Sequence, residues 1–309
     1  MSLADRIPPA HRGTAALLLI LSGSLGIQLS TALISDLIAS LGPAPVAALR
    51  ALLAALVLWL LVRPNPLALT RKDLGQVLAY GLVLTLMSIC FYQAVDRIPL
   101  GVAVTFEYLG AFLIALCGVR RLADGLLALL ALAGVILLAG PTFSGQADPL
   151  GFLWALGSAA SMAGYTLYSA SMGSSSPATR GLRGTSLSLA FSALLLLPLS
   201  LPALGQLGSH DYFLLCLSAL LGVALAYSAD NIAGQLTSAA LIGVLFSLDP
   251  VVGALVGALL LGQVLPLWSY LGILLIAGSG ALLVWRTNRS SLKGATRRPP
   301  SGLEEAEKL

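Results

Sequence analysis

Two carboxylic acids stand in strongly apolar surroundings. Glu107 lies near the middle of one long apolar stretch and Asp249 near the middle of another. An ionised carboxylate at the centre of a bilayer costs at least about 2.5–3.5 kcal/mol. Each acid must therefore face a protein interior or a wet cavity, find a partner, or be protonated. Such acids can exchange protons or bind a cation, whereas a protonated carboxyl that joins two helices is the structural alternative.

Arg50 and Pro250 are also unusual for apolar stretches. The Arg50 side chain is long enough to reach the membrane surface, or it pairs with a carboxylate inside the protein; both interpretations stay open. Pro250 follows Asp249 directly, and a proline inside a helix leaves the carbonyl four residues earlier, on Phe246, without its usual partner. We therefore expect a kink at this point and treat Pro250 as a hinge.

Polar and aromatic side chains recur at helical spacing in several apolar stretches. One stripe runs from Trp154 to Ser169, and another ends in Tyr227, Asp230 and Asn231. Each stripe is suited to line an aqueous pathway, although small residues also mark close helix packing, which we favour for the serines. The residues that we expect to bind substrate or protons are Glu107, Asp249, Arg50, Tyr92, Tyr108, Trp154, Tyr165, Tyr227 and Asn231.

The composition identifies the surroundings that must hold these residues. Of 309 residues, 58% are hydrophobic and only 10% are charged, against roughly 25% charged in soluble domains. The solvent for most of the surface must therefore be lipid. The net charge of +4 does not indicate nucleic acid, because the Lys and Arg residues lie in short loops and at the termini. We expect a small molecule and the bilayer as partners and no nucleic acid, and we leave a homodimer open.

Ten stretches are long and apolar enough to cross a bilayer as helices. None alternates with the period of two that marks a membrane β-barrel. The prediction is an all-α integral membrane protein. The predicted spans are 14–35, 44–62, 74–94, 98–119, 123–140, 149–172, 182–201, 212–232, 238–261 and 267–285.

The basic residues predict the orientation of these spans. With the N-terminus inside, nearly all of the 17 Lys and Arg residues fall on the inner side, and the outer loops hold only Arg97. We therefore place the protein in a bacterial inner membrane, with both termini in the cytoplasm. Residues 1–13 form the N-terminal tail, and the polar segment 287–309 is predicted to be a disordered tail.

The two halves of the chain resemble each other. A shift of 142 residues lays Gln93 on Gln235 and Glu107 on Asp249. Five spans per half is an odd number, so the second half must enter the membrane from the opposite side. This is an inverted repeat, which is recurrent among secondary transporters. The predicted repeats are residues 14–140 and 149–286.

Three segments carry a resemblance to a known family. They are Gly42 to Arg50, Ile98 to Tyr108 with the following Arg120-Arg121, and Leu248 to Gln263. The chain resembles the EamA family of the drug/metabolite transporter superfamily, and within it the bacterial threonine/homoserine exporters, over residues 14–286. It departs from the family at Asp249, where Glu usually precedes the proline, and at Gln263, where Glu usually ends the helix.

The resemblance implies ten helices in two inverted repeats and a central cavity that opens to one side at a time. It also implies export of small amino acids or related metabolites by a secondary transporter that could be coupled to protons. A drug or metabolite exporter of the same fold is the first alternative. No cofactor and no catalytic residue are implied.

An intramembrane enzyme or a channel is the alternative from another class. Glu107 and Asp249 could form a catalytic pair, but Asp249 follows Ser247-Leu248, not the Gly-x-Gly of intramembrane aspartyl proteases. The sequence has no His-Glu-x-x-His zinc motif. A repeat of inverted topology favours alternating access over a fixed pore.

Overall fold

The computed structural model describes residues 7–8, 11–98, 100–117, 122–139, 148–171, 176–246, 248–260 and 266–295. Within these ranges every regular element is a helix, which confirms the all-α prediction for this part of the chain. The elements are α2 (Arg12–Leu33), α3 (Ser35–Leu41), α4 (Pro43–Val62), η2 (Pro66–Ala68), α5 (Arg71–Val95), α6 (Leu100–Cys117), α7 (Leu122–Ala139), α8 (Pro149–Ser171), α9 (Leu182–Leu204), α10 (Ser209–Ala219), η4 (Leu220–Leu225), α11 (Ala226–Leu236), α12 (Ala239–Leu245), α13 (Leu248–Leu260) and α14 (Leu267–Ala295).

Helix is present at each predicted span. By length and composition, five described helices can cross a membrane, the fifth being the continuous run of α10, η4 and α11. Shorter apolar helices lie within α7, α13 and α14. Large apolar side chains such as Leu60 on α4 and Leu274 on α14 are more than half exposed, as expected for side chains that face lipid. The chain is therefore a multi-pass membrane protein.

Local sequence explains where several helices begin. Thr70 accepts a hydrogen bond from the backbone N–H of Asp73, and the Asp73 carboxylate accepts one from the backbone N–H of Thr70. This reciprocal cap satisfies donors that a helix start leaves free, so α5 begins at Arg71. Gly42 has a φ of 85° that glycine adopts without strain, and Pro43 then starts α4 in a position that needs no N–H donor.

The predicted kink in span nine is instead a break between two helices. α12 ends at Leu245 and α13 begins at Leu248, which puts Pro250 in the first turn of α13. A proline is well tolerated there because the first-turn N–H groups lack helical partners. The Phe246 carbonyl accepts a hydrogen bond from the backbone N–H of Asp249 at 3.2 Å. The expectation of one bent helix with a free Phe246 carbonyl is therefore wrong.

Two further elements differ from the sequence prediction. Span eight contains a π-helical segment, η4, between α10 and α11. Such segments are frequently found at functional sites. At the C-terminus, α14 continues to Ala295, so the backbone of residues 287–295 is helical where we expected a disordered tail. The remainder of that tail lies outside the described residues.

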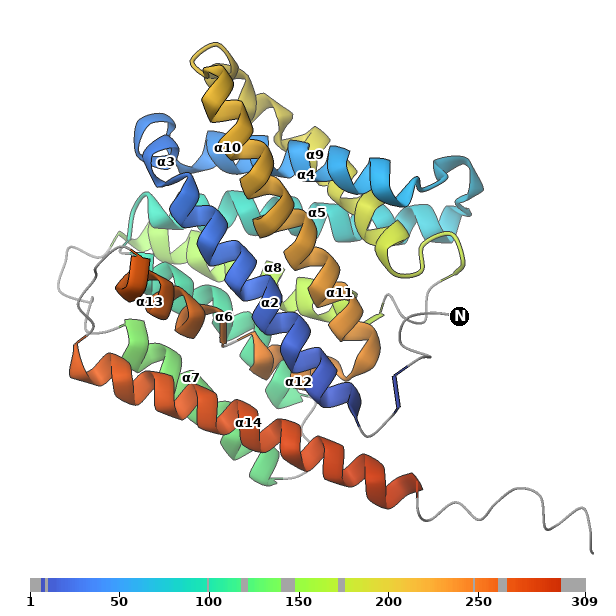
Figure 1. Ribbon diagram of the computed structural model, residues 1–309, viewed down its shortest axis with the longest axis vertical. Coiled ribbons are helices and arrows are strands. Elements are labelled where there is room, and N and C mark those ends of the chain that lie inside the picture. The colour runs from blue at the N-terminus through green and yellow to red at the C-terminus, as the bar shows by residue number, and fades with distance from the viewer. Residues whose placement is uncertain are drawn as a thin grey trace, which may run out of the picture.

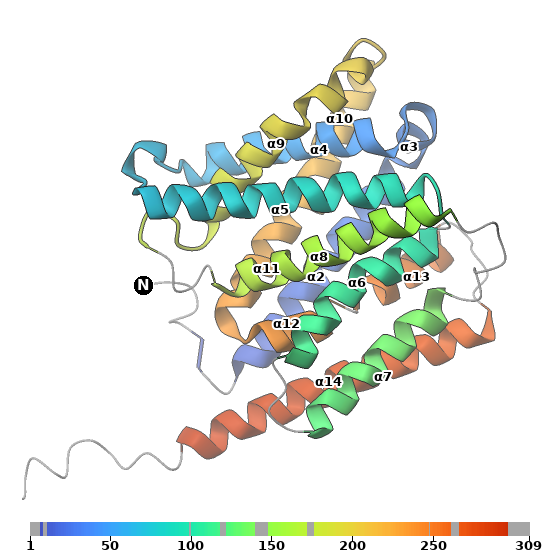
Figure 2. The same cartoon turned by 180° about the vertical axis from the view of Figure 1, so that it is seen from behind.

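The helices pack in pairs that relate the two halves of the chain. α7 and α14 lie side by side at one edge of the molecule in both views (Figures 1 and 2). α4 packs on α9, α2 packs on α11 and α13, and α8 packs on α5 and α6. The largest cluster of buried apolar side chains joins these helices around the centre. Most packing therefore occurs between the halves.

Gly110 allows α6 to approach α8 closely. A Cβ atom at this position would overlap the backbone carbonyl of Ala159 on α8. A backbone atom cannot swing aside, so Gly110→Ala must push the helices apart, and overpacking of this kind costs about 1–3 kcal/mol. We expect a lower thermal unfolding temperature in detergent. Gly278→Ala is the matched control, because nothing lies within 4 Å of its added Cβ. Equal stability of the two variants would contradict this packing.

Candidate functional site

Asp249 lies in the first turn of α13 and is held by two hydroxyl groups from the first half of the chain. Its Oδ1 accepts a hydrogen bond from Ser24 on α2, and its Oδ2 accepts one from the Tyr108 hydroxyl on α6 at 2.8 Å. The N-terminal end of a helix also favours a negative charge. The break before α13 thus places the carboxylate at a helix start, not along the side of a helix.

Glu107 lies one residue before Tyr108 and close to Asp249. Ser158 on α8 donates a hydrogen bond to its Oε1 at 2.9 Å. The two carboxyl groups are near enough to interact electrostatically. The structure therefore brings together the two acids that the sequence singled out, although they are 142 positions apart.

The hydrogen bonds to the two acids cross between the halves of the chain. Ser24 lies in the first helix of the first half and bonds to Asp249 of the second half. Ser158 lies in the first helix of the second half and bonds to Glu107 of the first half. We favoured packing for these serines, but each also holds an acid. A signal was available in the sequence, because both stand near the middle of the first span of their half.

Asp230 is a third acid at this site, and the sequence analysis gave it no role beyond a polar stripe. It lies on α11 and is 8% exposed. Its Oδ2 accepts a hydrogen bond from the Tyr165 hydroxyl at 2.6 Å, and it interacts electrostatically with Asp249. Its position in an apolar span was the same signal that identified Glu107.

Aromatic rings pack around the Tyr165 side of this acid cluster. The ring centroid of Tyr165 lies 6.1 Å from that of Tyr80, 5.6 Å from that of Tyr227 and 5.7 Å from that of Phe246. Tyr168 stacks on Tyr80 at 5.2 Å. Tyr80, Tyr165 and Phe246 are each at most 2% exposed. The rings therefore form a packed aromatic layer beside Asp230.

Arg50 contacts α2 and has no acid partner among the described residues. Its Nη2 donates a hydrogen bond to Ser30 on α2 at 2.8 Å. In the described part of the chain, no carboxylate oxygen lies within 4.0 Å of its guanidinium. Its buried Nε has no hydrogen-bond partner there. The guanidinium lies near Tyr92 and Tyr227. The expected pairing of Arg50 with a carboxylate is therefore wrong for the described part of the chain.

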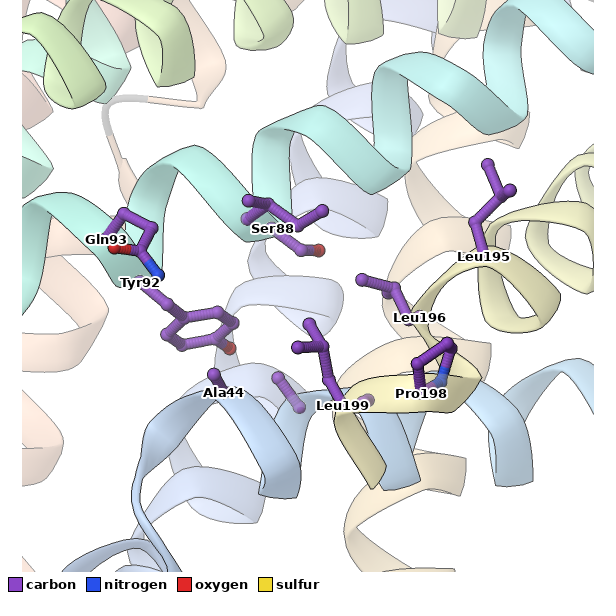
Figure 3. Close-up of a pocket in the computed structure, with 11 residues that line it drawn as sticks. Ala44, Ser88, Tyr92, Gln93, Leu195, Leu196, Pro198 and Leu199 are labelled. Atoms are coloured by element: carbon purple, nitrogen blue, oxygen red, sulfur yellow. The ribbon is translucent and has the colours of Figure 1, made fainter. Parts of the chain in front are cut away.

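A pocket of about 240 Å³ lies between α4, α5 and α9. Its lining is mostly alanine and leucine, and Tyr92 and Gln93 supply much of the polar part. Figure 3 shows the Tyr92 ring extending from α5 towards the start of α4 near Ala44, with Leu196 and Leu199 of α9 close by. Because Tyr92 also interacts with Arg50 and Glu107, it connects the pocket with the polar centre.

Three further residues were predicted to bind substrate or, for Pro250, to form a hinge. Trp154 packs in a separate apolar cluster with Ala94 and Ile98, and its indole N–H is buried without a hydrogen-bond partner. Asn231 accepts a hydrogen bond from Gln235 at 2.8 Å. The backbone of Pro250 belongs to α13, and its side chain lies outside the described residues. The structure does not bring Trp154 into contact with the acids.

The arrangement can accept cations. Each of the three acids receives its hydrogen bonds from neutral hydroxyl groups. In the described residues none of them is paired with Lys, Arg or His. A carboxylate so placed is stabilised by a proton or by a substrate ammonium group, because charge in a low-dielectric region requires compensation.

Comparisons with known proteins agree with this picture. Residues 149–285 match the model of the EamA-like transporter family. The threonine/homoserine exporter RhtA of Salmonella typhimurium strain SL1344 is 31% identical over 221 residues, which is 70% of this chain and 73% of that protein. RhtA of Escherichia coli K12 is 30% identical over 221 residues, with the same coverage of both chains. One solved crystal structure, 22% identical, superposes with a TM-score of 0.71 over 91% of this chain and 98% of that one.

The structural match shows the fold alone. The RhtA relatives, with the family model over the second half, confirm the resemblance found in the sequence. The names of the family and of these relatives describe transporters, not enzymes. The chain belongs to the EamA-like transporter family.

Proposed function

We propose that the protein is a secondary transporter that exports small amino acids of the threonine/homoserine type from the cytoplasm by alternating access. The observation that carries this proposal is the meeting of Glu107 and Asp249, one from each half, in a cluster whose acids have no cationic partner among the described residues. Such a cluster suits the ammonium group of an amino acid. The names of the RhtA relatives support the direction of transport and the substrate class.

We further propose that the two halves are inverted five-helix repeats with both termini in the cytoplasm. The crossed bonds from Ser24 to Asp249 and from Ser158 to Glu107 support the repeat. So does the packing, because α2 packs on α11 and α13 as α8 packs on α5 and α6. The family model covers residues 149–285, which is the second proposed repeat.

In this orientation the pocket between α4, α5 and α9 lies in the outer half of the membrane, and the aromatic layer lies between the acids and the cytoplasm. Tyr92 stands near the outer end of α5, whereas Tyr80 is nearer its inner end. The packed rings around Tyr165 then act as the inner barrier. Export requires that this layer open to load the substrate and close before it leaves through the pocket.

Proton coupling follows from the chemistry of the acids. A proton and a substrate ammonium group cannot both neutralise the same carboxylate. Loading the amino acid from the cytoplasm would therefore release a proton from Glu107 or Asp249, and a proton entering from outside would release the amino acid. This exchange would use the inward proton gradient of a bacterial membrane to drive export.

Protection of cells from excess amino acid tests the proposed function. Overproduction should let cells grow at concentrations of threonine or homoserine that inhibit cells with an empty vector, because export lowers the internal concentration. Growth curves with each amino acid and with lipophilic cations provide the measurement. Protection against the cations alone would show that the protein is a drug exporter of the same fold.

A further inference from the structure

The guanidinium of Arg50 is a partly buried charge that has no carboxylate partner among the described residues. It makes one hydrogen bond, to a neutral hydroxyl, and its buried Nε has no partner. Buried charges in proteins are normally paired, because leaving one uncompensated is costly. In the described residues no carboxylate supplies that pairing. The planar fork of an arginine is suited to binding a carboxylate with two parallel hydrogen bonds.

The helix facing Arg50 is shaped to make room for it. Gly222 lies in the π-helical segment η4, and a Cβ atom at this position would overlap both Arg50 Nη2 and Ser30 Oγ. Any larger residue would therefore displace the guanidinium from α2. A π segment and a glycine at the point of contact leave room for the arginine beside Ser30, and its charge has no carboxylate partner in the described part of the chain.

Two tyrosines link Arg50 to the acid cluster. Tyr92 lies near both Arg50 and Glu107. Tyr227 on α11 also lies near both groups. An α-amino acid carries its ammonium and carboxylate groups on one carbon, and Arg50 offers the positive charge that the carboxylate needs.

We propose that Arg50 binds the α-carboxylate of the transported amino acid. This inference rests on the proposed function and adds to it the zwitterion as the required substrate class. Tyr92 lines the pocket between α4, α5 and α9, so the amino acid side chain is directed towards that pocket. The apolar lining there accepts short apolar or weakly polar side chains.

Binding measured on the purified protein with matched ligands tests the assignment. L-threonine carries both charges, whereas L-threoninamide keeps the ammonium group and lacks the carboxylate. Affinities come from ligand-dependent thermal unfolding in detergent. The wild-type protein should bind threonine roughly 10- to 100-fold more tightly than threoninamide, as a charge-assisted hydrogen-bonded pair implies.

Variants locate that preference at Arg50. Arg50→Gln should reduce threonine affinity to the level of threoninamide and leave threoninamide binding unchanged. Arg50→Lys should give an intermediate result, because lysine keeps the charge but not the fork. Gly222→Ala should resemble Arg50→Gln. Arg63→Gln is the matched control, since this exposed residue caps the same helix α4 and should bind both ligands as the wild-type protein does.

Each other outcome has a definite meaning. Equal wild-type affinity for threonine and threoninamide would overturn the carboxylate site and leave amino acid export standing. If Arg50→Gln lowers the affinity for threonine and for threoninamide equally, the carboxylate site is also overturned and amino acid export still stands. Binding of lipophilic cations with no binding of any amino acid by the wild-type protein would overturn the proposed function, and the carboxylate site with it.

Discussion

Glu107→Gln is expected to abolish amino acid export and to leave the protein folded. The substitution removes the charge that receives the ammonium group or a proton, and losing one partner of a buried charge pair costs about 2–5 kcal/mol, or at least roughly 30-fold in rate or affinity. The amide oxygen of Gln can still accept the one hydrogen bond that Ser158 donates to Oε1. Export of labelled threonine from proteoliposomes and thermal unfolding in detergent measure the two effects separately.

Ser158→Ala is the control for the hydrogen bond alone. It removes the donor and keeps the carboxylate, so most of the export activity should remain. Wild-type export by Glu107→Gln at every pH would show that this carboxyl only joins helices.

Asp249→Asn is expected to lose both export and stability. Both carboxylate oxygens of Asp249 accept hydrogen bonds, from Ser24 and from Tyr108. An amide has one accepting oxygen, so one of the two hydroxyl groups is left facing an NH₂ group. An unsatisfied buried group costs about 1–3 kcal/mol, and the lost charge should lower export as Glu107→Gln does. Unfolding temperature and transport rate are measured on the same preparation.

The double variant Asp249→Asn with Tyr108→Phe separates the two losses. Phe removes one of the two hydroxyl donors, so the amide oxygen can accept from Ser24, and stability should partly return while export stays absent. If Asp249→Asn is as stable as the wild-type protein, the two hydrogen bonds do not hold this carboxylate as described.

Composition and hydropathy were sufficient to predict an all-helical membrane protein and the places where its described helices lie. A run of about 20 apolar residues must be helical in a bilayer, because lipid offers no partners for free backbone groups. The break before α13 was not predictable in this form. Pro250 is compatible with a kink inside a helix or with the first turn of a new one. Leu245 and Leu248, which flank the break, are both buried apolar residues, so hydropathy gives no sign of it.

The candidate site was predictable where a charge in an apolar span stands out. That principle identified Glu107 and Asp249. Applied to every apolar span, it would also have selected Asp230. It could not give the direction of a long side chain. The guanidinium of Arg50 is placed by contact with Ser30 and by the missing side chain of Gly222. These residues lie on other helices, and only the tertiary fold brings them together.

The most direct test of the central claim is the uptake of labelled threonine into inside-out membrane vesicles that contain the protein. The cytoplasmic side of such vesicles faces the medium, so export appears as accumulation. We predict accumulation that increases when the vesicle interior is made acidic, stops when a protonophore is added, and is absent with Glu107→Gln. Vesicles that accumulate neither threonine nor homoserine above those with Glu107→Gln, with or without a proton gradient, would contradict the account.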